Sequence, residues 1–133
     1  MSEYGQPVII KSPEYAAKEQ VEYIKNYYQE FENAVLSGDG YNHLGKHFTD
    51  YIDLESFAKM YVFQEFIKNL DAGLTSCYFY KDVGNKIVAG PAWDFDSAFG
   101  RDFGRDGVDM KDPVGLWVTG GHLHERCPAR QGL

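Results

Sequence analysis

Residues 75–96 read TSCYFYKDVGNKIVAGPAWDFD, and this stretch decides the fold. It opens with an aromatic run of residues that favour strands, then passes through a polar turn into a short apolar return run. Gly90 and Pro91 end the pairing, because proline has no N–H to donate to a strand ladder. The pattern predicts a small β-hairpin with strands near 76–81 and 86–90.

A first amphipathic helix is expected at residues 13–36. Its apolar side chains recur at steps of three and four residues, which places them in one stripe, while polar positions rich in Glu take the opposite side. Ser12 is expected to act as the N-cap and Pro13 to fill the first helical position, where a missing N–H costs nothing. A stretch that contains two glycines, residues 37–40, ends this helix.

A second helix is expected at residues 53–71. Asp53 is a favourable N-cap, and Gly73 is available for a left-handed cap at the other end. Apolar side chains cover most of the circumference of this helix, a pattern typical of a buried helix. The charges of Glu65 and Lys68 on such a helix therefore need partners.

These elements predict an α+β fold class, mainly helical, with two long helices and one small hairpin. With 133 residues, the chain is long enough for one core and not for two. We therefore expect residues 1–133 to form a single domain or part of one, and the family resemblance described below implies a partial domain. Residues 126–133 read as unrelated sequence and are expected to be a tail outside it.

Charge and composition exclude several classes of protein. The formal net charge is −7 and the pI is about 5.0, which disfavours non-specific binding to nucleic acid or to an anionic membrane. No apolar run approaches the roughly 18 residues of a membrane span, and the first residues show no signal peptide. The two cysteines, Cys77 and Cys127, form neither a disulfide framework nor a zinc motif.

Three aspartates flank the predicted hairpin. Asp71 ends the second helix, and Asp94 and Asp96 follow the second strand. Because a hairpin holds its two ends close, we expect these carboxylates to converge and to suit Mg²⁺ with phosphate oxygens, as in phosphoryl transfer. On an extended backbone, Asp94 and Asp96 face one side while Phe95 packs into the core.

The same residue types have other uses. An aspartate after a helix is often only a turn residue, and Asp-x-Asp also occurs in calcium loops and in metal-dependent glycosyltransferases. Nothing in the sequence resembles the alternating β/α domain that a glycosyltransferase needs, so that reading is the weakest.

Four motifs carry a resemblance to a known family. They are YIDLESF at 51–57, EFIKNLD at 65–71, SCYFYKD at 76–82 and GPAWDFD at 90–96. In combination they resemble the CotH kinase family, of the spore-coat protein H type, and the resemblance covers roughly residues 7–124.

The resemblance implies part of the C-lobe of an atypical protein-kinase-like fold, which phosphorylates protein Ser or Thr with ATP and Mg²⁺ or Mn²⁺. On this reading Asp71 corresponds to the catalytic-loop aspartate, and Asp94 and Asp96 are metal ligands. Ser76 lies five residues after Asp71, where kinase catalytic loops have a metal-binding Asn, so it is the expected cofactor-binding residue.

The resemblance also bears on partners and extent. It implies a bacterial protein of the spore coat or cell surface, a coat or surface protein as substrate, no nucleic acid and no membrane span. The nucleotide-gripping N-lobe should precede Ser12, and nothing there supplies it. We therefore expect a fragment of a transferase that is inactive alone, which either needs its missing N-lobe or self-associates.

A function of a different class remains as an alternative to the kinase. It is a non-catalytic spore-coat or surface interaction module, in which the aromatic hairpin binds a partner and the acidic cluster is structural or binds calcium. The two readings differ in what they require of the aspartates, because only the kinase depends on them for activity.

Overall fold

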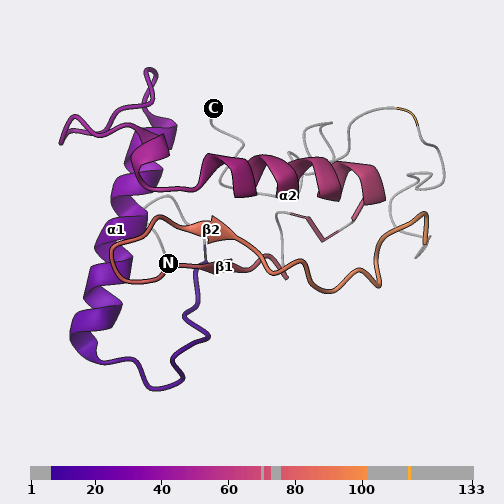
Figure 1. Cartoon of the computed structure of the whole chain (residues 1–133), viewed down its shortest axis with the longest axis horizontal. Coiled ribbons are helices and arrows are strands. Elements are labelled where there is room, and N and C mark those ends of the chain that lie inside the picture. The colour runs from indigo at the N-terminus through magenta and orange to yellow at the C-terminus, as the bar shows by residue number, and fades with distance from the viewer. Residues whose placement is uncertain (1–6, 70, 73–75, 102–113, 115–133) are drawn as a thin grey trace. The chain divides into compact units, whose positions relative to one another are not determined.

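The structure is a computed structural model that describes residues 7–69, 71–72, 76–101 and 114 (Figure 1). The described elements are two α-helices, one 3-10 turn and a two-stranded antiparallel hairpin, which confirms the mainly helical α+β class. In chain order they are α1 (Lys18–Leu36), η1 (Phe48–Asp50), α2 (Leu54–Ile67), β1 (Phe79–Tyr80) and β2 (Val88–Ala89). The chain divides into two compact units, Met1–Ile52 and Asp53–Leu133, which we describe separately.

Helix α1 begins at Lys18, five residues later than expected, so the predicted capping role of Ser12 is wrong. Residues 12–15 form a turn instead, and serine followed by proline favours a turn as readily as a helix start. The first turn of α1 is fixed by Gln20, whose Oε1 accepts a hydrogen bond from the N–H of Ala17 at 2.8 Å. The helix ends at Leu36, as predicted.

A buried asparagine organises the connector that follows α1. The side-chain amide of Asn42 donates to the carbonyl of Glu30 at 3.2 Å and to the hydroxyl of Tyr51 at 2.7 Å. Its Oδ1 accepts from the backbone N–H groups of Leu44 and Lys46. One buried side chain thus satisfies polar groups from α1, the loop and the end of this unit.

Tyrosines pack within the same unit. Tyr27 meets Tyr51 edge to face at 5.1 Å, and its hydroxyl donates to the carbonyl of Tyr51 at 3.0 Å. Burial, and to a smaller extent the charge of Glu32, raises the pKa of Tyr28 to about 12. Tyr28 is thereby held in its neutral form over the physiological range.

Helix α2 begins as predicted and ends earlier than predicted. Asp53 is its N-cap, with Oδ1 accepting from the N–H of Ser56 at 2.8 Å. The helix stops at Ile67 because Lys68 turns into the left-handed region, at φ 47°. Gly73, which was expected to take that conformation, lies outside the described residues.

The end of α2 is a Schellman motif without glycine. The N–H of Lys68 donates to the carbonyl of Glu65 at 3.2 Å, and the N–H of Asn69 donates to that of Gln64 at 3.3 Å. The ammonium of Lys68 donates to the carbonyl of Val114 at 3.1 Å. Backbone hydrogen bonds therefore fix the end of the helix, and no glycine at this position indicates it in the sequence.

The exposure of α2 corrects the expectation of a buried helix. Among its apolar residues, Phe66 is 81% exposed and Val62 is 64% exposed, while Gln64 and Ile67 are buried. The described hairpin and the segment after it cover one face of the helix, so apolar residues on the other face remain open to solvent. No helix in the described part of the chain is long and apolar enough to cross a bilayer.

The hairpin pairs Phe79 with Ala89 and Tyr80 with Val88. Its strands are shorter than predicted, although the N–H of Gly90 still donates across the pair to the carbonyl of Tyr78 at 2.9 Å. The type and order of the elements are as expected. The short ladder leaves most of the hairpin's stability to its packing on a helix.

The hairpin packs on α2, which runs alongside it in Figure 1. The rings of Phe57 and Phe79 stack at 5.4 Å with 12° between their planes, which confirms the predicted packing through Phe79. Two hydrogen bonds add to this contact: Ala89 N–H to Ser56 Oγ at 3.0 Å, and Asp53 N–H to the carbonyl of Ile87 at 2.8 Å. The start of α2 thus covers the outer edge of β2.

Candidate functional site

The two ends of the hairpin are joined by a hydrogen bond between Ser76 and Asp94. Ser76 Oγ donates to Asp94 Oδ2 at 2.9 Å. Ser76 precedes β1 and Asp94 follows β2, so the antiparallel pairing brings these positions together. The Asp94 side chain is exposed, which leaves its carboxylate accessible to a ligand.

Both residues of this pair have a left-handed backbone. The φ angle is 54° at Ser76 and 63° at Asp94. For a residue with a side chain this conformation costs about 1 kcal/mol, and such residues are concentrated at active sites and ligand clamps. The site is therefore held in a backbone arrangement that local preference alone does not select.

The left-handed Asp94 corrects the expected geometry of Asp-Phe-Asp. The segment is not a regular extended strand, so the two carboxylates are not placed by simple alternation. Phe95 nevertheless packs inward, with its ring edge to face on Phe63 of α2 at 5.2 Å and 82°. Asp94 and Asp96, which flank Phe95 in the sequence, are both exposed.

Asp96 lies in a segment tied back to α2. The guanidinium of Arg101 donates to the carbonyl of Asp96 at 3.2 Å. The N–H of Phe99 donates to the carbonyl of Ile67, the last residue of α2, at 2.8 Å. These bonds fix the segment that carries Asp94 and Asp96 against the end of the helix.

Asp71 sits in a tight turn directly after α2. Its N–H donates to the side-chain Oδ1 of Asn69 at 3.2 Å, and the N–H of Ala72 donates to the Asn69 carbonyl at 3.1 Å. Asn69 is 2% exposed, whereas Asp71 is half-buried. The buried amide therefore fixes the backbone of Asp71.

The three predicted aspartates do not form one tight cluster. Within residues 7–69, 71–72, 76–101 and 114, no three His, Cys, Asp or Glu side chains are grouped closely enough to hold a metal ion. The contact that the structure does provide joins Ser76 and Asp94. Whether the carboxylates of Asp71 and Asp94 approach each other does not follow from this contact, so the expected convergence of the aspartates stays a prediction.

The donor set at Ser76 and Asp94 suits a hard divalent cation. Carboxylate and hydroxyl oxygens are the ligands that Mg²⁺ accepts, and Mg²⁺ is commonly bound by one or two carboxylates with water and phosphate. A hydroxyl that donates its proton to Asp94 keeps lone pairs for a cation. The exposed carboxylate of Asp94 and the oriented hydroxyl of Ser76 therefore fit such an ion as two of its oxygen ligands.

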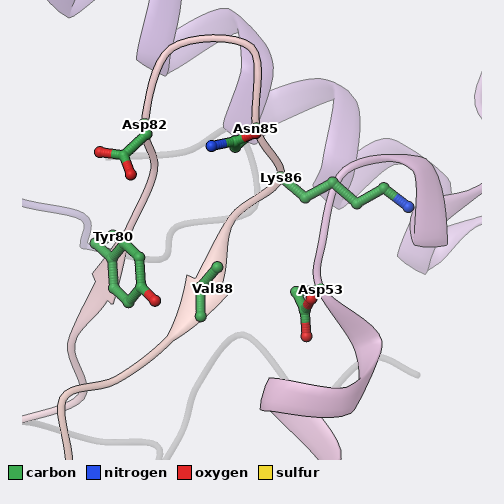
Figure 2. A pocket seen from close by; sticks show the side chains of 6 residues that line it. All are labelled: Asp53, Tyr80, Asp82, Asn85, Lys86 and Val88. Carbon is green, nitrogen blue, oxygen red and sulfur yellow. The ribbon is translucent and has the colours of Figure 1, made fainter.

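Sequence reasoning missed a pocket at the turn of the hairpin, shown in Figure 2. The pocket has a volume of about 350 Å³. Its lining residues are Asp53, Tyr80, Asp82, Asn85, Lys86 and Val88. These are turn and strand residues of mixed charge with no motif among them, so no sequence signal marks them as a site.

The order of the aspartates and the hairpin resembles that of protein kinases. An aspartate after a helix, a hairpin and a second aspartate followed by Phe is the order of catalytic and metal-binding aspartates in protein kinases. A model of the CotH kinase protein family matches residues 3–124, and the chain belongs to this family. Comparison of the chain with curated proteins and with solved structures finds no match.

Proposed function

We propose that this chain carries the catalytic and metal-binding half of a CotH-type protein Ser/Thr kinase that uses ATP with Mg²⁺ or Mn²⁺. The observation that carries the proposal is the Ser76–Asp94 hydrogen bond, which places an oriented hydroxyl on an exposed carboxylate at the meeting ends of the hairpin. Membership of the CotH kinase family supports a kinase-like function at the level of the family.

Asp94, Asp96 and Ser76 hold the cation in this proposal. Asp94 supplies an exposed carboxylate, and Ser76 supplies hydroxyl lone pairs next to it. Asp96 contributes from a segment that is fixed to the end of α2. When bound, the cation neutralises charge on the phosphoryl group that is transferred.

Asp71 acts on the acceptor hydroxyl of the protein substrate. In this role its carboxylate accepts a hydrogen bond from the Ser or Thr hydroxyl and orients it toward the phosphoryl group. The buried Asn69 supports the role, because it holds the Asp71 backbone in place. Such positioning is the main contribution of a protein to phosphoryl transfer.

The extent of the catalytic unit is also part of the proposal. Residues 1–133 form one partial domain, with 126–133 as a tail beyond the family match. In this proposal, turnover also requires a nucleotide-gripping lobe with a phosphate-gripping loop and a lysine. The substrate is a protein of the bacterial spore coat or cell surface.

Calorimetry of ATP binding to the chain, with and without Mn²⁺, tests the site. We expect binding that depends on Mn²⁺, that falls at least about tenfold in Asp94→Asn and that persists in Asp71→Asn. Asp39→Asn, at an exposed loop position of the other unit, is the matched control. ATP binding that ignores both Mn²⁺ and Asp94→Asn contradicts the proposal.

A second candidate, an interaction module, is favoured by the exposure of the hairpin's aromatic side chains. Phe79 is 50% exposed, and Tyr80 and Trp93 are also exposed. If the hairpin only binds a protein partner, Asp71→Asn and Asp94→Asn leave that binding unchanged, and Tyr78→Ala or Phe79→Ala removes it. The kinase proposal expects loss of Mn²⁺-dependent ATP binding from Asp94→Asn instead.

A further inference from the structure

The pocket at the hairpin turn lies on the face that does not stack on α2. Tyr80 and Val88 are directly paired across the two strands, so their side chains share one face. Phe79, the preceding residue, points to the other face and stacks on Phe57. The pocket of about 350 Å³ is therefore formed by the free face of the hairpin, its turn and Asp53.

The groups at one side of this pocket are available to a ligand. The Tyr80 hydroxyl and the Asp82 carboxylate make no hydrogen bond or ion pair within the described part of the chain. The Tyr80 ring is 53% exposed. Figure 2 shows the Lys86 side chain extending away from Tyr80 and Asp82, on the side where Asp53 lies.

We propose that this pocket binds an arginine side chain of the protein substrate. A carboxylate that accepts a guanidinium, beside an aromatic face on which the guanidinium stacks, matches arginine better than a point charge such as lysine. Asn85 also lines the pocket, and its side-chain amide carries a further acceptor. The net charge of −7 favours the approach of a basic segment.

The position of the pocket sets the spacing in the substrate. Six residues separate Ser76, at the proposed cation site, from Asp82, at the pocket. At about 3.3 Å per residue this is no more than about 20 Å. An extended substrate therefore carries its arginine at most about six residues from the phosphorylated Ser or Thr. This spacing rests on the proposed function, whereas binding of arginine itself does not.

An NMR titration of the ¹⁵N-labelled chain, without metal or ATP, tests the pocket. The probes are Nα-acetyl-arginine amide and its uncharged analogue Nα-acetyl-citrulline amide. We expect arginine to shift the amide signals of Tyr80, Asp82 and Asn85, and citrulline to bind about fivefold more weakly or not at all. Raising the salt concentration should weaken arginine binding, because the pocket is exposed.

Two variants and a control sharpen the titration. Asp82→Asn keeps the shape of the side chain and removes its charge, and should weaken arginine binding about fivefold. Tyr80→Ala should weaken it by a similar factor through loss of the ring. Val83→Ala is the control, because Val83 is 99% exposed in the same turn and does not line the pocket.

Three outcomes overturn the proposal: equal binding of citrulline and arginine, no effect of Asp82→Asn, or signal shifts with inorganic phosphate in place of arginine. The last result would make the pocket an anion site at Lys86. Because the titration omits metal and ATP, its failure leaves the Asp94 site untouched. Loss of the Asp94 site leaves arginine binding intact and removes only the six-residue spacing.

Discussion

The hydroxyl of Ser76 donates to the carboxylate of Asp94 across 2.9 Å, and both residues have a left-handed backbone. The bond joins the start of the hairpin to the segment after it, which Phe95 anchors on α2. The hydroxyl is thereby oriented before any cation arrives, and its free lone pairs remain beside an exposed carboxylate. Two strained residues in contact mark this end of the hairpin as the part to test first.

The left-handed end of α2 predicts a stabilising substitution. In Lys68→Gly, glycine adopts the φ of 47° without strain, so the free energy of unfolding should rise by about 0.5–1 kcal/mol. Urea denaturation measures the change. Lys59→Gly is the control, because Lys59 lies inside the helix, where the same substitution should lower stability by about 1 kcal/mol. Lys68→Ala removes the same ammonium and keeps a Cβ, and a lower stability of Lys68→Gly than of Lys68→Ala contradicts the Schellman end.

The burial of Asn69 predicts that its substitution destabilises the protein. Asn69→Ala leaves the N–H of Asp71 without its acceptor, and should lower the free energy of unfolding by about 1–3 kcal/mol. Asn85→Ala, at an exposed turn position, should stay within about 0.5 kcal/mol of the unchanged protein. Equal effects of the two substitutions in urea denaturation would show that Asn69 does not hold the turn.

The raised pKa of Tyr28 predicts a loss of stability at alkaline pH. The folded-state pKa of about 12 exceeds the usual 10.0, so the unfolded chain loses this proton first. The stability that Tyr28 contributes is fully present below pH 10 and is lost as the pH rises toward 12. Denaturation midpoints between pH 9 and pH 12 measure the slope. Tyr28→Phe should flatten it, and an unchanged slope contradicts the assignment.

The proposed extent of the catalytic unit predicts no turnover by these 133 residues alone. Positioning both ATP and the acceptor requires a nucleotide-gripping lobe in addition to the aspartates proposed here. Transfer of labelled γ-phosphate to a mixture of basic proteins, with Mn²⁺ present, is the measurement. Asp94→Asn sets the background. Turnover well above that background contradicts the partial-domain proposal.

The hairpin was predictable because its signals are local. Aromatic runs, a Gly-containing turn and Pro91 all lie within residues 75–96 and need no distant contact. The N-cap at Asp53 could be predicted for the same reason, because its hydrogen-bond partner Ser56 is only three residues away. The ends of α1 and α2 were less predictable, because Ser12 suits a turn as well as a cap, and Lys68 gives no sign that it becomes left-handed.

The location of the candidate site in the chain could be predicted from the sequence, but the directions of its side chains could not. Antiparallel pairing implies that Ser76 and Asp94 approach each other, which the structure shows. The direction of each carboxylate depends instead on the left-handed Asp94 and on the packing of Phe95, neither of which follows from spacing. The pocket beside Asp82 could not be predicted for a similar reason, because the residues that line it come together only in the folded turn.

Paramagnetic broadening by Mn²⁺ in the ¹⁵N NMR spectrum of the chain tests the central claim most directly. If Ser76, Asp94 and Asp96 hold the cation, their amide signals and those of their neighbours disappear first at low Mn²⁺, and Asp94→Asn abolishes the effect. Broadening confined to other carboxylates, such as Asp53 and Asp82, or broadening at Ser76 that persists in Asp94→Asn, would contradict the account.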